Sequence, residues 1–106
     1  GGEDNSGNLM LTVDDLTLNL KSKEVYRANT EIVLTAREFK LLEYLLRNKN
    51  RVVSRTDMLE NVWEVDFDLG TNVIDVYINY LRKKIESGFS TKIIKTVVGM
   101  GYVIKD

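Results

Sequence analysis

The sequence contains no cysteine and no histidine. Disulfide bonds, thiolate chemistry, imidazole general bases and most zinc sites are therefore excluded. No apolar run approaches the roughly 20 residues that a membrane-spanning helix needs, and no signal-peptide pattern opens the chain. Its 106 residues, 43% hydrophobic and 29% charged, suffice for one core but not for two. We therefore expect a single globular domain in the cytoplasm.

The net charge of −1 lacks the basic excess that is typical of nucleic-acid-binding domains. Its distribution along the chain is uneven, however. Residues 1–34 carry a net charge of −3, residues 35–78 carry −2, and residues 79–106 carry +4. The C-terminal segment is thus the part of the chain that is suited to an anionic partner.

The first eight residues are glycine-rich and polar, which is typical of a disordered linker or a remnant of cloning. We assign residues 9–106 to one domain. Its first part holds four short segments with β character, separated by polar turns, and this pattern predicts an antiparallel meander. The segments are Leu9–Val13, Leu16–Leu20, Glu24–Arg27 and Glu31–Leu34.

Helical spacing of apolar residues follows in two segments. The first, Thr35–Asn48, opens with Thr35 and Glu38 in the spacing of a capping box. The second begins after Ser54, which is a candidate N-cap. It ends near Trp63, a residue that could stack on a base or bind a partner, but whose spacing favours a place in the core.

A third helix is predicted over Thr71–Glu86, and its two sides differ in chemistry. One side is an apolar stripe: Ile74, Ile78, Leu81 and Ile85. The other side collects Asn72, Val76, Asn79, Tyr80 and Lys83. Amide, phenol, cationic and apolar groups together can read base edges and hold phosphates. The alternative is an ordinary solvated helix face.

Two further strands, Lys92–Val98 and Tyr102–Lys105, are predicted around a three-residue loop, Gly99–Gly101, with glycines available for positive φ. A hairpin behind a basic helix is the arrangement of a winged helix. The predicted fold is therefore α+β: a winged helix-turn-helix with an N-terminal four-stranded antiparallel sheet, three helices and a C-terminal β-hairpin wing.

Four segments, taken in order, resemble the C-terminal DNA-binding effector domain of OmpR/PhoB-type response regulators. They are LTAREFKLLEYLL (34–46), RVVSRTDMLENVW (51–63), TNVIDVYINYLRKKIE (71–86) and IIKTVVGMGYVIK (93–105). The resemblance implies sequence-specific promoter binding and transcription regulation in a two-component phosphorelay, with no enzymatic activity, metal or cofactor. It implies double-stranded promoter DNA, RNA polymerase and a receiver domain of the parent protein as partners. The isolated domain is expected to be monomeric and to dimerise on DNA.

The resemblance also assigns roles to individual positions. The third helix would enter the major groove and the wing would approach the neighbouring minor groove. The implied DNA contacts are Asn72, Val73, Asp75, Val76, Asn79, Tyr80, Arg82, Lys83, Lys95, Thr96, Gly99 and Gly101. Val76 suits a thymine methyl. Asp75 would accept from a cytosine amino group or orient a base-reading neighbour, or else only complement the helix dipole.

Some positions depart from the common pattern of the family. Members often carry arginine where this chain has Asn72 and Tyr80, and histidine where it has Tyr77. The wing often has an arginine where this chain has Val98, which cannot probe a narrow, electronegative minor groove. We therefore expect the wing to act through Lys95, Thr96 and the backbone of Gly99–Gly101, with modest affinity and a shallow salt dependence.

The segment between the second and third helices, Glu64–Gly70, exceeds the turn of a simple helix-turn-helix. By the resemblance, Glu64–Thr71 corresponds to the segment that is implicated in touching RNA polymerase, through Glu64, Asp66, Phe67 and Asp68. Two other function classes remain open. One is a winged-helix protein-interaction module without strong DNA binding, consistent with the near-neutral charge. The other is an enzyme built on Asp66 and Asp68, for which no nucleophile or third ligand is present.

Overall fold

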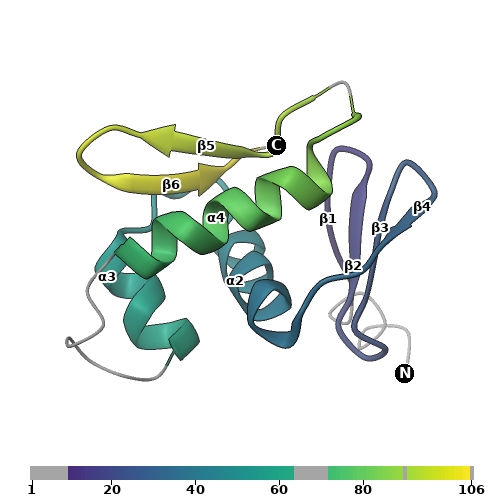
Figure 1. Cartoon of the computed structure of the whole chain (residues 1–106), viewed down its shortest axis with the longest axis horizontal. Helices are drawn as coiled ribbons and strands as arrows, with labels where there is room; N and C mark the ends of the chain where they lie inside the picture. The colour runs from purple at the N-terminus through teal and green to yellow at the C-terminus, as the bar shows by residue number, and fades with distance from the viewer. Residues whose placement is uncertain (1–9, 64–71, 90, 106) are drawn as a thin grey trace.

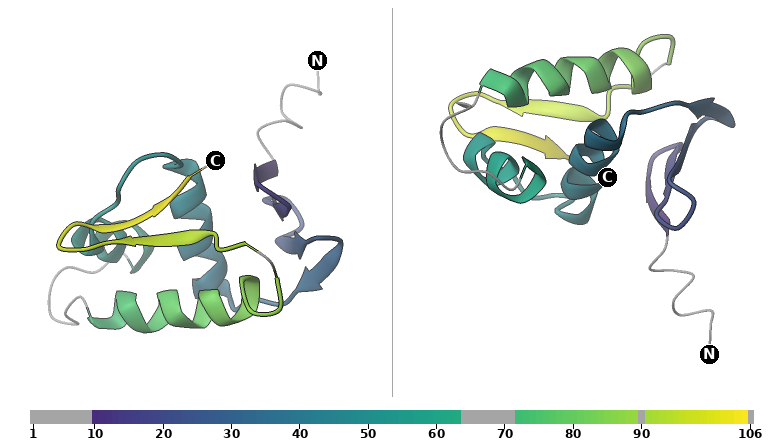
Figure 2. Two further views of the ribbon diagram at one scale, coloured as in Figure 1. Left: turned by 90° about the horizontal axis from the view of Figure 1, so that it is seen from above. Right: turned by 60° about the horizontal axis from the view of Figure 1, so that its bottom comes forward.

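The computed structural model describes residues 10–63, 72–89 and 91–105. Within them, four strands precede three helical segments and a two-stranded hairpin, as Figure 1 shows, and this order confirms the predicted winged-helix fold. Figure 2 shows the N-terminal sheet at one end of the molecule, with the hairpin and the long helix α4 side by side at the other. The expected linker, residues 1–8, lies outside the described residues.

The N-terminal sheet is an antiparallel meander in the order β1-β2-β3-β4. Its strands are β1 (Met10–Val13), β2 (Leu16–Asn19), β3 (Glu24–Arg27) and β4 (Thr30–Ile32). Leu16 and Leu18 of β2 are buried and alternate with half-buried polar residues, as the period-two pattern predicts. Ala28 and Asn29 join β3 to β4, and both have the positive φ of a type I′ turn.

Helix α2 (Ala36–Arg47) begins at the predicted capping box. The hydroxyl of Thr35 accepts from the backbone N–H of Glu38 at 3.2 Å, and the Glu38 carboxylate accepts from the N–H of Thr35 at 2.9 Å. The same carboxylate accepts from the Lys84 ammonium at 2.7 Å. Because Lys84 belongs to α4, the cap of α2 also ties these two helices together.

Helix α3 (Arg55–Met58) is capped by the predicted residue, since the Ser54 hydroxyl accepts from the N–H of Asp57 at 3.1 Å. The chain then continues as a π-helical turn, η1 (Leu59–Trp63). Apolar spacing alone does not distinguish this wider winding from an α-helix. Trp63 is half-buried and packs against the core, which confirms its predicted structural place.

The wing consists of β5 (Ile94–Val97) and β6 (Gly101–Ile104). Its three-residue loop is Val98–Met100, one residue earlier than predicted, because Gly101 pairs with Val97 inside the hairpin. The N–H of Met100 closes the loop by donating to the Val97 carbonyl at 2.9 Å.

Gly101 is needed in β6 because another backbone lies against it. Its φ is 144°, and a Cβ at this position would overlap the carbonyl oxygen of Val53. Directly beside it, Val53 and Tyr102 exchange two backbone hydrogen bonds of 2.8 and 3.0 Å. The segment before α3 is thereby fixed to the wing, which places the start of the helix-turn-helix relative to the hairpin.

Candidate nucleic-acid interface

Helix α4 (Asn72–Ile85) has the two faces that the sequence predicts. Its inner stripe, Ile74, Ile78, Leu81 and Ile85, has 0% exposure at every position. Its outer residues, Asn72, Val76, Asn79, Tyr80 and Lys83, are all exposed. Val76 and Tyr80 are 44% and 45% exposed although both carry large apolar groups. In Figure 1, α4 runs across the front of the molecule, so this outer face is available to a partner.

One flank of α4 is clamped to the wing through Asp75. Its Oδ1 accepts from Arg55 Nε at 2.8 Å and from the hydroxyl of Tyr102. Burial alone would raise the pKa of Asp75, but these two hydrogen bonds and the Arg55 charge outweigh it, and the pKa is lowered. Asp75 therefore joins α3, α4 and β6 as an ionised acceptor.

Further along the same flank, Arg82 is bound by the first strand of the wing. Its guanidinium donates to the Ile94 carbonyl at 3.0 Å and to the Thr96 hydroxyl at 2.7 Å. It also lies 5.5 Å from the ring centre of Tyr102. Two predicted phosphate-contacting residues, Arg82 and Thr96, are thus brought together.

A basic groove runs between the end of α4 and β5. It is lined by Arg82, Glu86, Lys92, Ile94, Lys95 and Thr96. The Glu86 carboxylate accepts from the backbone N–H groups of Ile93 and Ile94, both at 2.8 Å, which fixes the start of β5. Lys92 was not among the predicted DNA contacts, although its place at the start of a predicted wing strand, in the basic C-terminal segment, was a signal that could have identified it.

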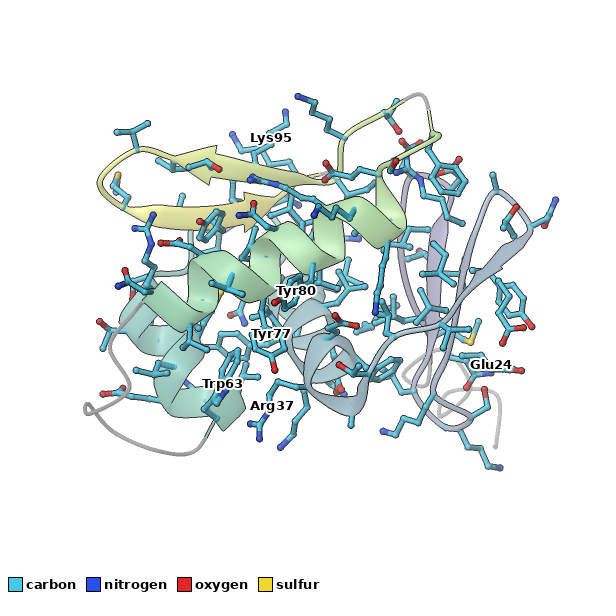
Figure 3. The ribbon with its side chains drawn as sticks, in the orientation of Figure 1. Glu24, Arg37, Trp63, Tyr77, Tyr80 and Lys95 are labelled. Carbon is cyan, nitrogen blue, oxygen red and sulfur yellow. The ribbon has the colours of Figure 1, made fainter. Side chains whose placement is uncertain are left out.

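The tip of the wing is apolar. Val98 and Met100 are 90% and 61% exposed, and Gly99 between them has a φ of 76°. Lys95 is exposed on β5, and Figure 3 shows it on the hairpin above α4. Gly101 is buried against Val53 and serves the backbone packing described above. Of the predicted wing contacts, Lys95, Thr96 and Gly99 are therefore exposed and Gly101 is not.

Arg27 of β3 connects the N-terminal sheet to α4. Its side chain is fully buried, and its guanidinium donates to the carbonyl of Ile85, the last residue of α4, at 2.6 Å. It also donates to Asp15 at 2.8 Å and to the carbonyl of Thr91 at 2.8 Å. A cation is favourable at a helix C-terminus, where backbone carbonyls lack partners. The sheet therefore fixes the end of α4 and the segment that leads into the wing.

Residues 29–104 match the family described as "Transcriptional regulatory protein, C terminal". That match covers well over half of the 106-residue chain. The chain belongs to this family. Its fold is that of a winged-helix DNA-binding domain, and the resemblance to OmpR/PhoB-type response regulators is confirmed. The chain is thus a transcription-regulating effector domain and not an enzyme.

Relatives of this effector domain include the Bacillus subtilis protein described as an uncharacterized transcriptional regulatory protein, YkoG. Identity is 46% over 95 residues, which are 90% of the present chain and 42% of YkoG. Mycobacterium avium response regulator MprA is 42% identical over 104 residues, 98% of this chain and 46% of MprA. The chain thus spans less than half the length of these relatives.

A solved structure places the same fold on DNA. The DNA-binding domain of Klebsiella pneumoniae RstA, in complex with the RstA box, superposes with a TM-score of 0.79 at 26% identity. The superposition covers 91% of this effector domain and 96% of the RstA chain.

The segment predicted to touch RNA polymerase, with Glu64, Asp66, Phe67 and Asp68, lies outside the described residues. The carboxylate pair that was considered for an enzyme, Asp66 and Asp68, lies there too.

Among the residues that the structure describes, no helix has the length and apolar character needed to cross a bilayer.

Proposed function

We propose that this effector domain binds promoter DNA sequence-specifically with the outer face of α4 in the major groove. The observation that carries the proposal is the division of α4 into a fully buried isoleucine and leucine stripe and an exposed face of amide, phenol and cationic groups. Asn72, Asn79 and Tyr80 supply hydrogen-bonding groups, Val76 suits a thymine methyl, and Lys83 suits a phosphate. Val73, half-buried on this helix, borders the same face.

The groove beside α4 would hold the phosphate backbone. Lys92, Lys95 and Thr96 line this groove, and the Arg82 guanidinium is held in it by its hydrogen bond to the Thr96 hydroxyl. The wing would contact DNA through these groups and the backbone near Gly99, because Val98 offers no charge to a minor groove. Asp75 is engaged by Arg55 and Tyr102, so its proposed part is to hold the wing against α4.

In the parent protein we propose regulation by a phosphorylated receiver domain in the cytoplasm. Dimerisation of the receivers would raise the local concentration of two effector domains at adjacent half-sites. The present chain alone would be monomeric and would bind weakly, with two copies on a duplex that carries both half-sites. RNA polymerase is the proposed partner of Glu64, Asp66, Phe67 and Asp68, whose acidic and apolar character suits a basic surface.

Selection of duplexes from a random pool, followed by anisotropy titration at low ionic strength, tests this proposal. The unmodified chain should enrich a defined sequence. Lys83→Ala should weaken binding by about three- to tenfold on all duplexes, as expected for one lost phosphate contact. Lys21→Ala removes an exposed lysine from the turn between β2 and β3, far from α4, and should bind as the unmodified chain does. The absence of any salt-dependent binding would instead favour a winged-helix protein-interaction module.

A further inference from the structure

Four side chains form a continuous row from the start of α2 to the outer face of α4. Tyr77 meets Trp63 edge-on, with ring centres 5.1 Å apart and planes inclined by 75°. Tyr80 meets Tyr77 in the same way, at 5.5 Å and 74°. The Arg37 guanidinium lies over the Trp63 ring, 5.2 Å from its centre. Figure 3 shows this row, with Arg37 and Trp63 below Tyr77 and Tyr80 at the surface of α4.

The inner end of the row is fixed by the body of the protein. Arg37 donates to the Val62 carbonyl at 2.8 Å, so the cation over Trp63 is held by the backbone of η1. Trp63 and Tyr77 are both half-buried and pack against the hydrophobic core. Tyr80 is the exposed end, at 45%, and belongs to the face of α4 that we propose enters the groove. The contacts from Trp63 through Tyr77 therefore restrict the orientation of the exposed Tyr80 side chain.

From this arrangement we infer that Tyr77 is a positioning residue that holds Tyr80 in one orientation and so sets part of the base preference of α4. The inference rests on the proposed DNA-binding function. An edge-to-face aromatic pair favours the contacting orientation by about two- to tenfold beyond the effect of burial. That is enough to favour one orientation of an exposed tyrosine, which has only two side-chain torsions to restrict.

The orientation of Tyr80 before it meets DNA matters because its side chain is neutral. An arginine is drawn to DNA by charge and can grip guanine with two hydrogen bonds wherever its flexible stem reaches. A tyrosine has no long-range attraction of that kind, so its contribution to base discrimination depends on where its ring and hydroxyl lie before contact. A row of rings anchored in the core supplies that placement.

The probe for the test is the duplex that the unmodified chain selects from a random pool, together with all its single-base-pair variants. Tyr80→Ala should lower discrimination at one or two base pairs, which identifies the pairs that Tyr80 contacts. Tyr77→Leu keeps an apolar side chain but removes the ring, and should lower discrimination at the same pairs by about two- to tenfold. Tyr77→Phe keeps the ring contacts and should discriminate as the unmodified chain does.

A double variant separates positioning from simple destabilisation. In a Tyr80→Ala background, Tyr77→Leu should cause no further loss of discrimination, because the side chain through which it acts is gone. Partial unfolding would weaken binding to every duplex equally and leave the affinity ratios unchanged. The inference is overturned if Tyr77→Leu leaves the ratios intact, lowers them at other pairs, or adds to Tyr80→Ala. Should the unmodified chain select no sequence, the proposed function itself fails.

Discussion

At the scale of single residues, the site depends on a few buried or half-buried ionic side chains that join elements far apart in the sequence. Arg27 is fully buried yet binds two backbone carbonyls and the carboxylate of Asp15. Glu38 is 3% exposed and binds Lys84 as well as its own helix cap. Removing one partner from such a site leaves the other groups buried without hydrogen bonds, which costs more than the bond itself contributes.

Arg27→Met should therefore lower the free energy of unfolding by about 3–5 kcal/mol, the range for a broken buried pair. The methionine can fill the space, but the carbonyls of Ile85 and Thr91 lose their donor. Arg47→Met is the matched control, because Arg47 pairs with Glu43 on the exposed side of α2; its effect should stay within about 0.5 kcal/mol. Urea unfolding of both variants measures the difference, and equal effects would contradict the role assigned to Arg27.

The stability of the domain should depend on pH through Glu38. Burial would raise the pKa of this carboxyl, but the hydrogen bonds from Lys84 and Thr35, with the Lys84 charge, lower it below its ordinary value of 4.5. A lowered pKa means that the contribution is present above that value and is lost as the pH falls through the pKa of the folded state. The stability difference between the unmodified chain and Glu38→Gln should thus shrink between about pH 6 and about pH 3. A difference independent of pH would refute this assignment.

At the scale of elements, α4 has one side buried in the core and the opposite side exposed to solvent. Ile78→Ala should cost about 2–5 kcal/mol of stability, because it leaves a cavity where the side chain has 0% exposure. Asn79→Ala, the adjacent exposed residue, should leave thermal stability nearly unchanged and weaken DNA binding. Thermal unfolding and anisotropy titration of the two variants provide the measurement. Equal losses of stability would mean that the helix is turned differently.

Much of this could be predicted from the sequence because the determinants are local. The capping box at Thr35, the N-cap at Ser54 and the two faces of α4 depend on neighbours within one or two helical turns. The predictions for the wing were less accurate, because there the chain contacts segments that are distant in the sequence. Gly101 was assigned to the loop and to DNA, whereas the approach of Val53, which no local pattern reveals, makes it part of β6.

The same reason explains what the sequence left open around the site. For Asp75 the charge was evident, but its partners come from α3 and β6 and could not be chosen by spacing. The row from Arg37 to Tyr80 likewise requires three helical segments to be placed first. Pairwise side-chain contacts across elements depend on the packed fold, while the residue types available for them are visible in the sequence.

At the scale of the whole molecule, the charge is divided along the chain, with −3 over residues 1–34 and +4 over residues 79–106. Of the residues that the structure describes, 10–34 form the N-terminal sheet with its turns at one end, and α4 and the wing lie at the other, as Figure 2 shows. The basic side chains of α4 and β5, among them Arg82, Lys83 and Lys95, therefore lie on the proposed DNA-binding side.

This division predicts a shallow salt dependence. Arg82, Lys83, Lys92 and Lys95 allow about three to four phosphate contacts, so log K against log salt should fall with a slope of about −3 to −4. Lys83→Ala should make the slope shallower by about one. Titrations at a series of salt concentrations measure both slopes. A slope near zero, or one that Lys83→Ala leaves unchanged, would contradict the proposed phosphate contacts.

The central claim, that the outer face of α4 lies against duplex DNA, is tested most directly by amide chemical-shift changes during titration with a selected duplex. We expect the changes to concentrate on residues 72–83 and on the wing strand β5, with the outer face of the N-terminal sheet unaffected. Changes centred on Glu24, Tyr26 and Glu31 of that sheet, with α4 unperturbed, would contradict the account.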